Sequence, residues 1–434
     1  MFREITAIVA VLAWVPVSKA QGTEDYELPP ISYSAAQPTE IISRLQTRIA
    51  SGDLKFSGND RDIVQVLLDE LQIPAESQIL VFSKTSLQRQ RISPETPRAI
   101  YFSDTCYVGW VPGGLVEVAS MDPVLGPVFY SFDPRQESEK GHNFVREPDC
   151  LRCHGGNFVP HIPAVFARSV FPDEKGEAIL RHGSQVVDYR TPFEERWGGW
   201  FVTGKHGRTF HRGNIIANEQ GSGPIMDSAR GANITELSSR IERKQYLEES
   251  SDIIALLVFE HQLAMDNSIT RAGLKCRRML AYQKGLQEAF KEPVTEEPTY
   301  DSVKSVFESA TREVLGCLLF KDEAALPDGL EGNPRFQHAF MAGARRSGNG
   351  ASLKDLEMKG HLFRNRCSYL IYSDAFLALP QPLKRRIYSR LAKILLTPGT
   401  DSTYVHLGVD ERARIRSILR ETHSEMRDYL RSDG

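Results

Sequence analysis

The sequence lacks the features that mark several large functional classes. A formal net charge of −3 over 434 residues leaves no basic excess of the kind that attracts nucleic acid, and there is no acidic tail. Beyond the N-terminus, no apolar stretch approaches the length of a transmembrane helix. The chain also has no internal repeat and no low-complexity tract, which gives no support to a repeat architecture.

Cysteine is scarce as well. The chain has six cysteines, and two of them share one short motif. The other four permit three disulfide pairings in an oxidising compartment, and buried free thiols are an equally good interpretation. A second closely spaced cysteine pair is absent, which argues against a zinc site. The four are Cys106, Cys276, Cys317 and Cys367.

The first 20 residues are typical of a secretory signal peptide. A charged start precedes an apolar run over residues 5–17, and small residues before and at Ala20 offer a cleavage point. The run is too short to span a bilayer comfortably, so we expect its removal, with an uncleaved anchor as the alternative. We therefore expect a periplasmic or otherwise exported protein without a stable membrane span after cleavage.

Periodicity predicts an α+β protein in three parts. Residues 21–135 combine helical patterns at 40–51 and 60–71 with short strand-like segments between residues 79 and 131. Residues 136–233 are rich in Gly, Pro, His and Arg and show weak periodicity. From 234 to 434 the pattern is helical, over 252–267, 300–320, 353–376, 383–396 and 410–430. We expect a small mixed N-terminal domain, an irregular segment and a mainly helical C-terminal domain.

The irregular segment contains the motif with the clearest chemistry, the sequence CLRCH at residues 150–154. Two thiols separated by two residues can reach both vinyl groups of one porphyrin, and the next imidazole then lies at the iron. A thioredoxin-like redox pair is the rival interpretation, but that motif opens a helix after a strand. We predict one covalent haem c, held by Cys150 and Cys153, with His154 as an iron ligand.

A second iron ligand is expected in residues 196–214, which are rich in Gly, Trp and His. His206 and His211 are its candidates for metal binding, and a glycine-rich hairpin with surface histidines is the alternative. Met226, in a later loop, is a further candidate, and an open position is the remaining outcome. Five arginines near the motif would suit haem propionates, although a solvated surface position is the simpler interpretation for each. They are Arg146, Arg152, Arg168, Arg181 and Arg190.

Glu260 and His261 form a second polar spot, within an apolar helical stretch. A metal or catalytic role would need partners that the sequence does not locate. We expect a histidine paired inside a helical core.

Several long segments resemble one family. They are VFSKTSLQRQRISPETPRAIYFSD from Val81, YVGWVPGG, CLRCHGG, RWGGWFVTGKHG, SDIIALLVFEHQ and SYLIYSDAF. The chain resembles exported bacterial proteins described as cytochrome c domain-containing, over nearly the whole mature length. The resemblance implies a single haem c and electron transfer, with Cys150, Cys153, His154, His206 and His211 inside the family pattern. It implies no substrate. Because Gly and Pro follow the motif, the small cytochrome c fold is not expected.

Motif and resemblance together predict a periplasmic monohaem c-type cytochrome that acts in electron transfer with a redox partner protein and binds no nucleic acid. One alternative is a haem-dependent, peroxidase-like oxidoreductase with an open distal site. Another is a haem-containing sensor or scaffold protein.

Overall fold

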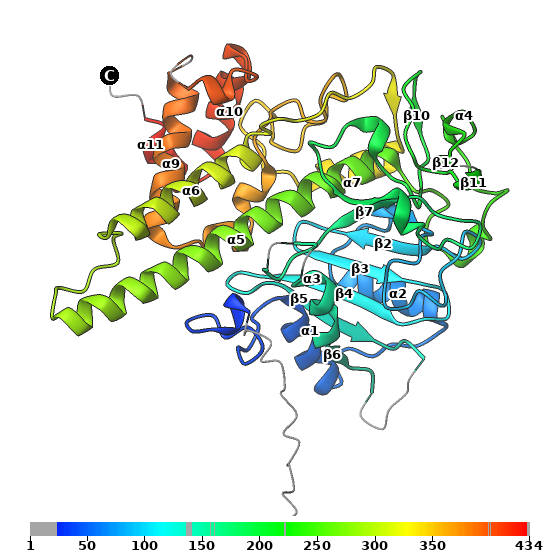
Figure 1. Ribbon diagram of the computed structural model, residues 1–434, viewed down its shortest axis with the longest axis horizontal. Helices are drawn as coiled ribbons and strands as arrows, with labels where there is room; N and C mark the ends of the chain where they lie inside the picture. Colours follow the sequence, from blue (N-terminus) through cyan, green and yellow to red (C-terminus); the bar gives the residue numbers. More distant parts are fainter. Residues whose placement is uncertain are drawn as a thin grey trace, which may run out of the picture.

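The computed structural model describes residues 24–135, 141–156, 158–159, 161–220, 223–397, 399 and 401–431. The predicted signal peptide lies outside these described residues. The chain is an α+β protein, as the sequence predicts, with a large sheet in its N-terminal half and helices in its C-terminal half (Figure 1). Within the described ranges, no helix is both long and apolar enough to cross a membrane.

Seven antiparallel strands form the main sheet in the spatial order β6-β5-β4-β3-β2-β1-β9. They are β1 (Ile79–Val81), β2 (Arg98–Phe102), β3 (Cys106–Trp110), β4 (Val116–Asp122), β5 (Gly126–Phe132), β6 (Phe144–Arg146) and β9 (Trp200–Phe201). Three further strand pairs are small. They are β7 (Ala167–Val170) with β8 (Ser184–Val187), β10 (Lys205–His206) with β13 (Leu330–Glu331), and β11 (Asn218–Gln220) with β12 (Gly223–Ile225).

The α-helices are α1 (Ile41–Ala50), α2 (Asp60–Glu70), α3 (Leu151–His154), α4 (Ser228–Gly231), α5 (Ile253–Phe290), α6 (Asp301–Leu318), α7 (Pro334–Ala342), α8 (Asp374–Leu377), α9 (Gln381–Leu396), α10 (Val409–Thr422) and α11 (Met426–Tyr429). The 3-10 helices are η1 (Asp25–Glu27), η2 (Ala75–Ser77), η3 (Pro148–Cys150), η4 (Leu180–His182), η5 (Phe193–Glu195), η6 (Arg243–Gln245), η7 (Tyr369–Tyr372) and η8 (Ser402–Tyr404).

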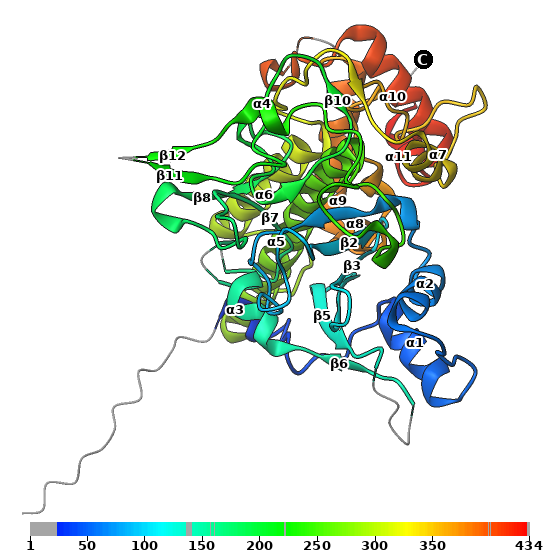
Figure 2. The ribbon, with the colours of Figure 1, turned by 90° about the vertical axis from the view of Figure 1, so that its right-hand side faces the viewer.

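The main sheet is covered on both faces. Successive side chains of a strand point in opposite directions, so one strand contributes residues to both cores. On β3, Cys106, Val108 and Trp110 belong to the core beneath α1 and α2, whereas Tyr107 belongs to the core around α5. Figure 2 shows α1 and α2 on one side of the sheet and α5 on the other. The α5 side of the sheet is the side on which the candidate site lies.

The helical C-terminal half differs from prediction in one long segment. The pattern at 252–267 is the first part of α5, which has 38 residues and begins at an Asp252 side chain that accepts a hydrogen bond from the Ala255 N–H. The helix predicted at 353–376 is wrong. That stretch turns at Met358 and Gly360, which have φ values of +55° and +72°, and a left-handed backbone ends a right-handed helix. Its apolar side chains are buried by irregular chain rather than by one helix face.

The segment 136–233 supplies strands to the main sheet. β6 pairs with β5 and β9 pairs with β1, so the sheet crosses the predicted boundary at residue 135. The four cysteines outside the motif are all buried and free, which agrees with the free-thiol interpretation.

Candidate functional site

The motif lies at one wall of a cavity between the main sheet and α5. Cys150 ends η3, and Cys153 and His154 lie on α3. Cys150, Cys153 and His154 all line this cavity, which has a volume of about 350 Å³. The sheet and α5 supply most of the remaining wall, mainly with apolar side chains. They include Val81, Ile100, Ala119, Phe129, Trp200, Phe259 and Leu263.

Local packing explains why glycine follows the motif. Gly155 ends α3, and a Cβ atom added there would lie 2.6 Å from the Tyr26 hydroxyl oxygen. A larger residue would therefore push Tyr26 away and change the direction in which the chain leaves His154. The short helix is thereby held against η1.

The His154 side chain is oriented by one hydrogen bond and two aromatic rings. Its Nδ1 atom lies 2.8 Å from the Ala164 carbonyl oxygen. A carbonyl can only accept, so Nδ1 carries the proton and Nε2 keeps its lone pair. The imidazole ring packs between Phe129 and Phe166, with centroid separations of 4.8 and 4.6 Å. Burial lowers the pKa of His154 to about 4, so the imidazole is neutral at pH 7 and suited to bind a metal through Nε2.

The cavity wall also carries more positive than negative charge. Lys84, Arg89, Arg98 and Arg168 are its cations, against Glu117 and Asp149. Arg98 forms an ion pair with Glu117 at 2.5 Å. Its guanidinium lies against the backbone of β3 where Gly109 leaves room, since a Cβ atom there would be 2.1 Å from Arg98 Nη2. The Arg168 guanidinium lies 4.5 Å from the Phe158 ring centroid.

His206 and His211 are not brought to this cavity. They lie together, 4.5 Å apart between ring centroids, and neither lines the cavity wall. Both ring nitrogens of His206 are engaged by backbone: Nδ1 lies 2.6 Å from the Thr209 carbonyl oxygen, and Nε2 accepts the Asn233 N–H. His211 Nδ1 accepts the Gly213 N–H. The structure therefore corrects the expectation that either residue faces His154, because the histidine-rich loop folds around its own backbone.

Most of the other residues that the sequence suggested as iron ligands or propionate partners also lie outside this cavity. Met226 lies beyond β12 and is not part of the cavity wall. Of the five arginines near the motif, Arg168 alone lines the cavity. Arg146 binds backbone carbonyls at Tyr33 and Ala36 instead. Sequence reasoning missed Lys84, Arg89 and Arg98, which come from the N-terminal half, where no motif marks them.

Glu260 and His261 are fully buried on α5, as a core position requires. Glu260 accepts a hydrogen bond from Arg196 Nη1 at 2.7 Å, and both side chains are 1% exposed. His261 stacks on Phe320 and lies 2.8 Å from the Ser368 hydroxyl. Across the described part of the chain, no group of three or more potential ligands gathers to hold a metal ion. The pairing of His261 with the Ser368 hydroxyl agrees with the expectation of a paired histidine inside a helical core.

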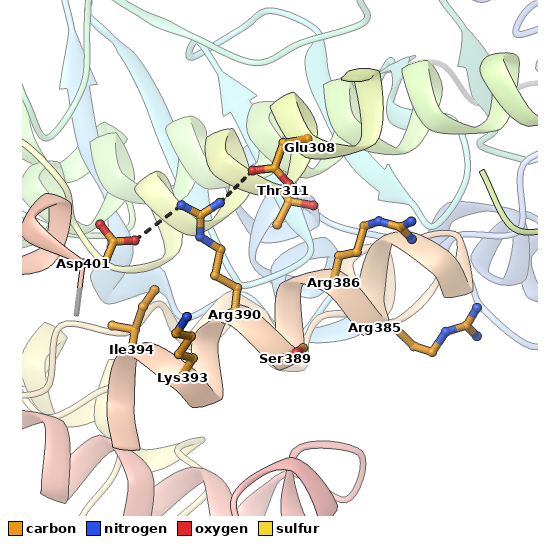
Figure 3. Close-up of a pocket in the computed structure, with 9 residues that line it drawn as sticks. All are labelled: Glu308, Thr311, Arg385, Arg386, Ser389, Arg390, Lys393, Ile394 and Asp401. Carbon is orange, nitrogen blue, oxygen red and sulfur yellow. Dashed lines mark hydrogen bonds and ion pairs between the residues drawn. The ribbon is translucent and has the colours of Figure 1, made fainter. Parts of the chain in front are cut away.

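Another cavity in the described structure has different chemistry. It has a volume of about 700 Å³ and lies between α6 and α9 (Figure 3). Arg390 reaches across it to Glu308 at 2.8 Å and to Asp401 at 3.4 Å. Neither Cys nor His is among its described lining residues. Its lining has four cations and two acids: Arg385, Arg386, Arg390 and Lys393 against Glu308 and Asp401. Because its described lining offers neither thiol nor imidazole, we place the candidate site at the motif.

No family model, curated protein or solved structure matches this chain. The assignment of the site therefore depends on the motif and on the geometry around it.

Proposed function

We propose that this chain is an exported, periplasmic monohaem c-type cytochrome that acts in electron transfer. The observation that carries the proposal is the convergence of Cys150, Cys153 and His154 on one cavity, with His154 held through Nδ1 and its Nε2 left for a metal. A haem bound there would supply one-electron redox chemistry. The protein residues hold it, orient the iron ligand and limit access of water.

The residues present fit a haem group. The cavity volume of about 350 Å³ lies within the range of about 300–1,000 Å³ that is usual for ligand sites. The apolar wall from the sheet and α5 suits a flat apolar macrocycle. The cations on the wall, Arg98 and Arg168 among them, suit two propionates, because guanidinium groups bind carboxylates through paired hydrogen bonds.

His154 is the residue that would bind the iron. Its hydrogen bond to the Ala164 carbonyl is the interaction that commonly fixes the tautomer and orientation of metal-ligating histidines. Phe129 and Phe166 restrict rotation of the ring. The thioethers to Cys150 and Cys153 would keep the haem attached whatever ligand occupies the opposite side.

A second candidate function is a haem-dependent oxidoreductase with an open distal site. One observation favours it: among the described lining residues, His154 is the only histidine, and no methionine is present. These are the side chains that most often complete a low-spin cytochrome c. An iron without a second protein ligand would accept an external small molecule.

Mass spectrometry tests the central proposal. The protein, expressed together with haem maturation machinery, should carry the mass of one covalent haem and begin after Ala20. A Cys150→Ala, Cys153→Ala double variant should lose that mass. A Cys276→Ala variant, in which a buried thiol outside the cavity is removed, should keep it. A wild-type protein without added mass would contradict the haem assignment.

Ligand binding separates the two functions. Carbon monoxide added to the reduced protein, or cyanide added to the oxidised protein, should leave the absorption spectrum unchanged if the iron only transfers electrons through a closed coordination sphere. A rapid, saturable spectral change would instead support the oxidoreductase. Replacement of His154 by Ala should remove the protein's nitrogen ligand to the iron and change the absorption spectrum in either case.

A further inference from the structure

A buried acid lies next to the cavity and has no part in holding a haem. Tyr107, on β3, lines the cavity wall. Its hydroxyl lies 2.5 Å from Oδ2 of Asp266 on α5 and accepts a hydrogen bond from Gln262 Nε2 at 3.0 Å. Tyr107 therefore connects the cavity directly to a carboxyl group in the layer behind it.

Asp266 has surroundings that disfavour its charge. Its side chain is 1% exposed, and no Lys or Arg of the described chain forms an ion pair with it. The titratable groups that face it are Tyr107, Asp104 from the loop between β2 and β3, and Tyr369 from η7. Burial is the main reason that the pKa of Asp266 is raised to about 8, and the nearby Asp104 adds to the effect. Lys354 is bound to Asp104 at 2.7 Å.

Solvent reaches the far side of this polar cluster. Gln262, which binds the Tyr107 hydroxyl, also accepts a hydrogen bond from Tyr369 at 2.8 Å. Gln262 and Asp104 line a second cavity of about 350 Å³, and Tyr369 and Asp104 line a third of about 260 Å³. The Asp104 side chain is 44% exposed. The polar cluster around Asp266 therefore borders two cavities other than the candidate haem site.

We propose that Asp266, linked to the cavity through Tyr107, is a redox-coupled proton site. This inference rests on the proposed haem function. One electron from an external one-electron donor reduces the iron from the ferric to the ferrous state, and one proton from solvent converts the Asp266 carboxylate to the carboxylic acid. Charge in the region between sheet and α5 is then unchanged. Asp266 does not line the cavity itself. It would therefore act on the haem through its charge and not through direct contact.

Electrostatics makes the coupling necessary. An added negative charge in a region of low dielectric raises the proton affinity of a nearby buried acid. The coupling is reciprocal. If the oxidation state of the iron changes the proton affinity of Asp266, then the protonation of Asp266 changes the midpoint potential of the iron by the same free energy, and the potential depends on pH. The coupling is therefore measurable at equilibrium.

Spectroelectrochemical titration of the full haem-loaded protein is the test. The midpoint potential of the wild type should fall with increasing pH in a window around pH 8, at a slope that cannot exceed about 59 mV per tenfold change in proton activity for one electron. Asp266→Asn keeps an acceptor for the Tyr107 hydroxyl but cannot titrate, so its potential should be flat through this window. Tyr107→Phe removes the hydroxyl that stabilises the carboxylate, so the window should move to higher pH.

A control uses another acid whose pKa is raised. Glu323 is half-buried, desolvation raises its pKa to about 7, and it does not line the cavity. Glu323→Gln should keep the pH-dependent window of the wild type. If Glu323→Gln removed the window, or if Asp266→Asn retained it, the assignment to Asp266 would be overturned.

Infrared difference spectroscopy gives a readout that needs no variant to fold. Reduction of the wild type should produce a carboxylic acid C=O band that shifts in deuterium oxide, in a sample poised within the window. Its absence would refute the proposal. Failure of the haem assignment is distinguishable, because it would appear first as a missing haem mass. An attached haem with a potential that does not change with pH would overturn this inference alone.

Discussion

Asp266→Asn should change the stability of the protein by an amount that depends on pH. The pKa of Asp266 is about 8 in the folded protein, against an ordinary value of 3.8. Between these two values the unfolded chain has lost the proton and the folded chain still holds it. Because the pKa of Asp266 is higher in the folded protein than in the unfolded chain, its contribution to stability is fully present below pH 3.8. This contribution is lost progressively as the pH rises toward 8.

The magnitude follows from the same linkage. Each pH unit in this interval removes about 1.36 kcal/mol from the free energy of unfolding. From pH 5 to pH 7 the wild type should therefore lose about 2.7 kcal/mol relative to Asp266→Asn, which has no proton to lose. Any fixed cost of placing an amide beside Tyr107 is the same at both pH values and cancels. Other buried acids are present in both proteins and cancel as well.

Urea unfolding at pH 5, 6 and 7 measures this difference. The free energy of unfolding is extrapolated to zero urea for the wild type and for Asp266→Asn at each pH. Glu174→Gln, at an exposed side chain, should give a difference from the wild type that does not vary over this range. A constant difference for Asp266→Asn would refute the reasoning, because it would mean that Asp266 is already ionised in the folded protein at pH 5.

Three other substitutions or treatments test the packing around the site. Arg196→Met leaves Glu260 buried without its cation, and we expect a loss of about 3–5 kcal/mol in urea unfolding; a loss below 1 kcal/mol would contradict a buried ion pair. Gly109→Ala places a Cβ atom against Arg98, and we expect thermal unfolding to show a loss of about 1–3 kcal/mol, whereas an unchanged melting temperature would show that Arg98 does not lie there. Thiols outside the motif should react with a thiol reagent only after unfolding, and labelling in the folded state would contradict their burial. These thiols are Cys106, Cys276, Cys317 and Cys367.

Much of the fold could be predicted because local sequence decides it. The predicted strands near residues 79, 99, 106, 115 and 128 correspond to β1 to β5. Short β-branched and aromatic runs between turn residues favour strands. The helix expected at 353–376 failed because burial there comes from tertiary contacts, and apolar residues in irregular chain imitate helical spacing.

The site could be predicted only where its residues are close in sequence. Cys150, Cys153 and His154 form a recognisable motif because the proposed haem would require this spacing. Residues 196–214 were misleading for the opposite reason. His206 binds the loop's own backbone at Thr209 and Asn233 through both ring nitrogens. His211 does so only through Nδ1, and its buried Nε2 has no partner in the described structure. The local density of histidines does not distinguish a backbone role from metal binding.

Tyr107 and Asp266 lie beyond any local pattern, since 159 positions separate them. Each looks ordinary alone, a tyrosine on a strand and an acid on a helix. Only the packing of α5 on the sheet places the acid behind the cavity wall, and that packing makes the acid costly at neutral pH. A buried carboxyl group without a cation costs stability at neutral pH. We therefore expect its chemical effect at the cavity that Tyr107 lines, where one added charge would alter the protonation of Asp266.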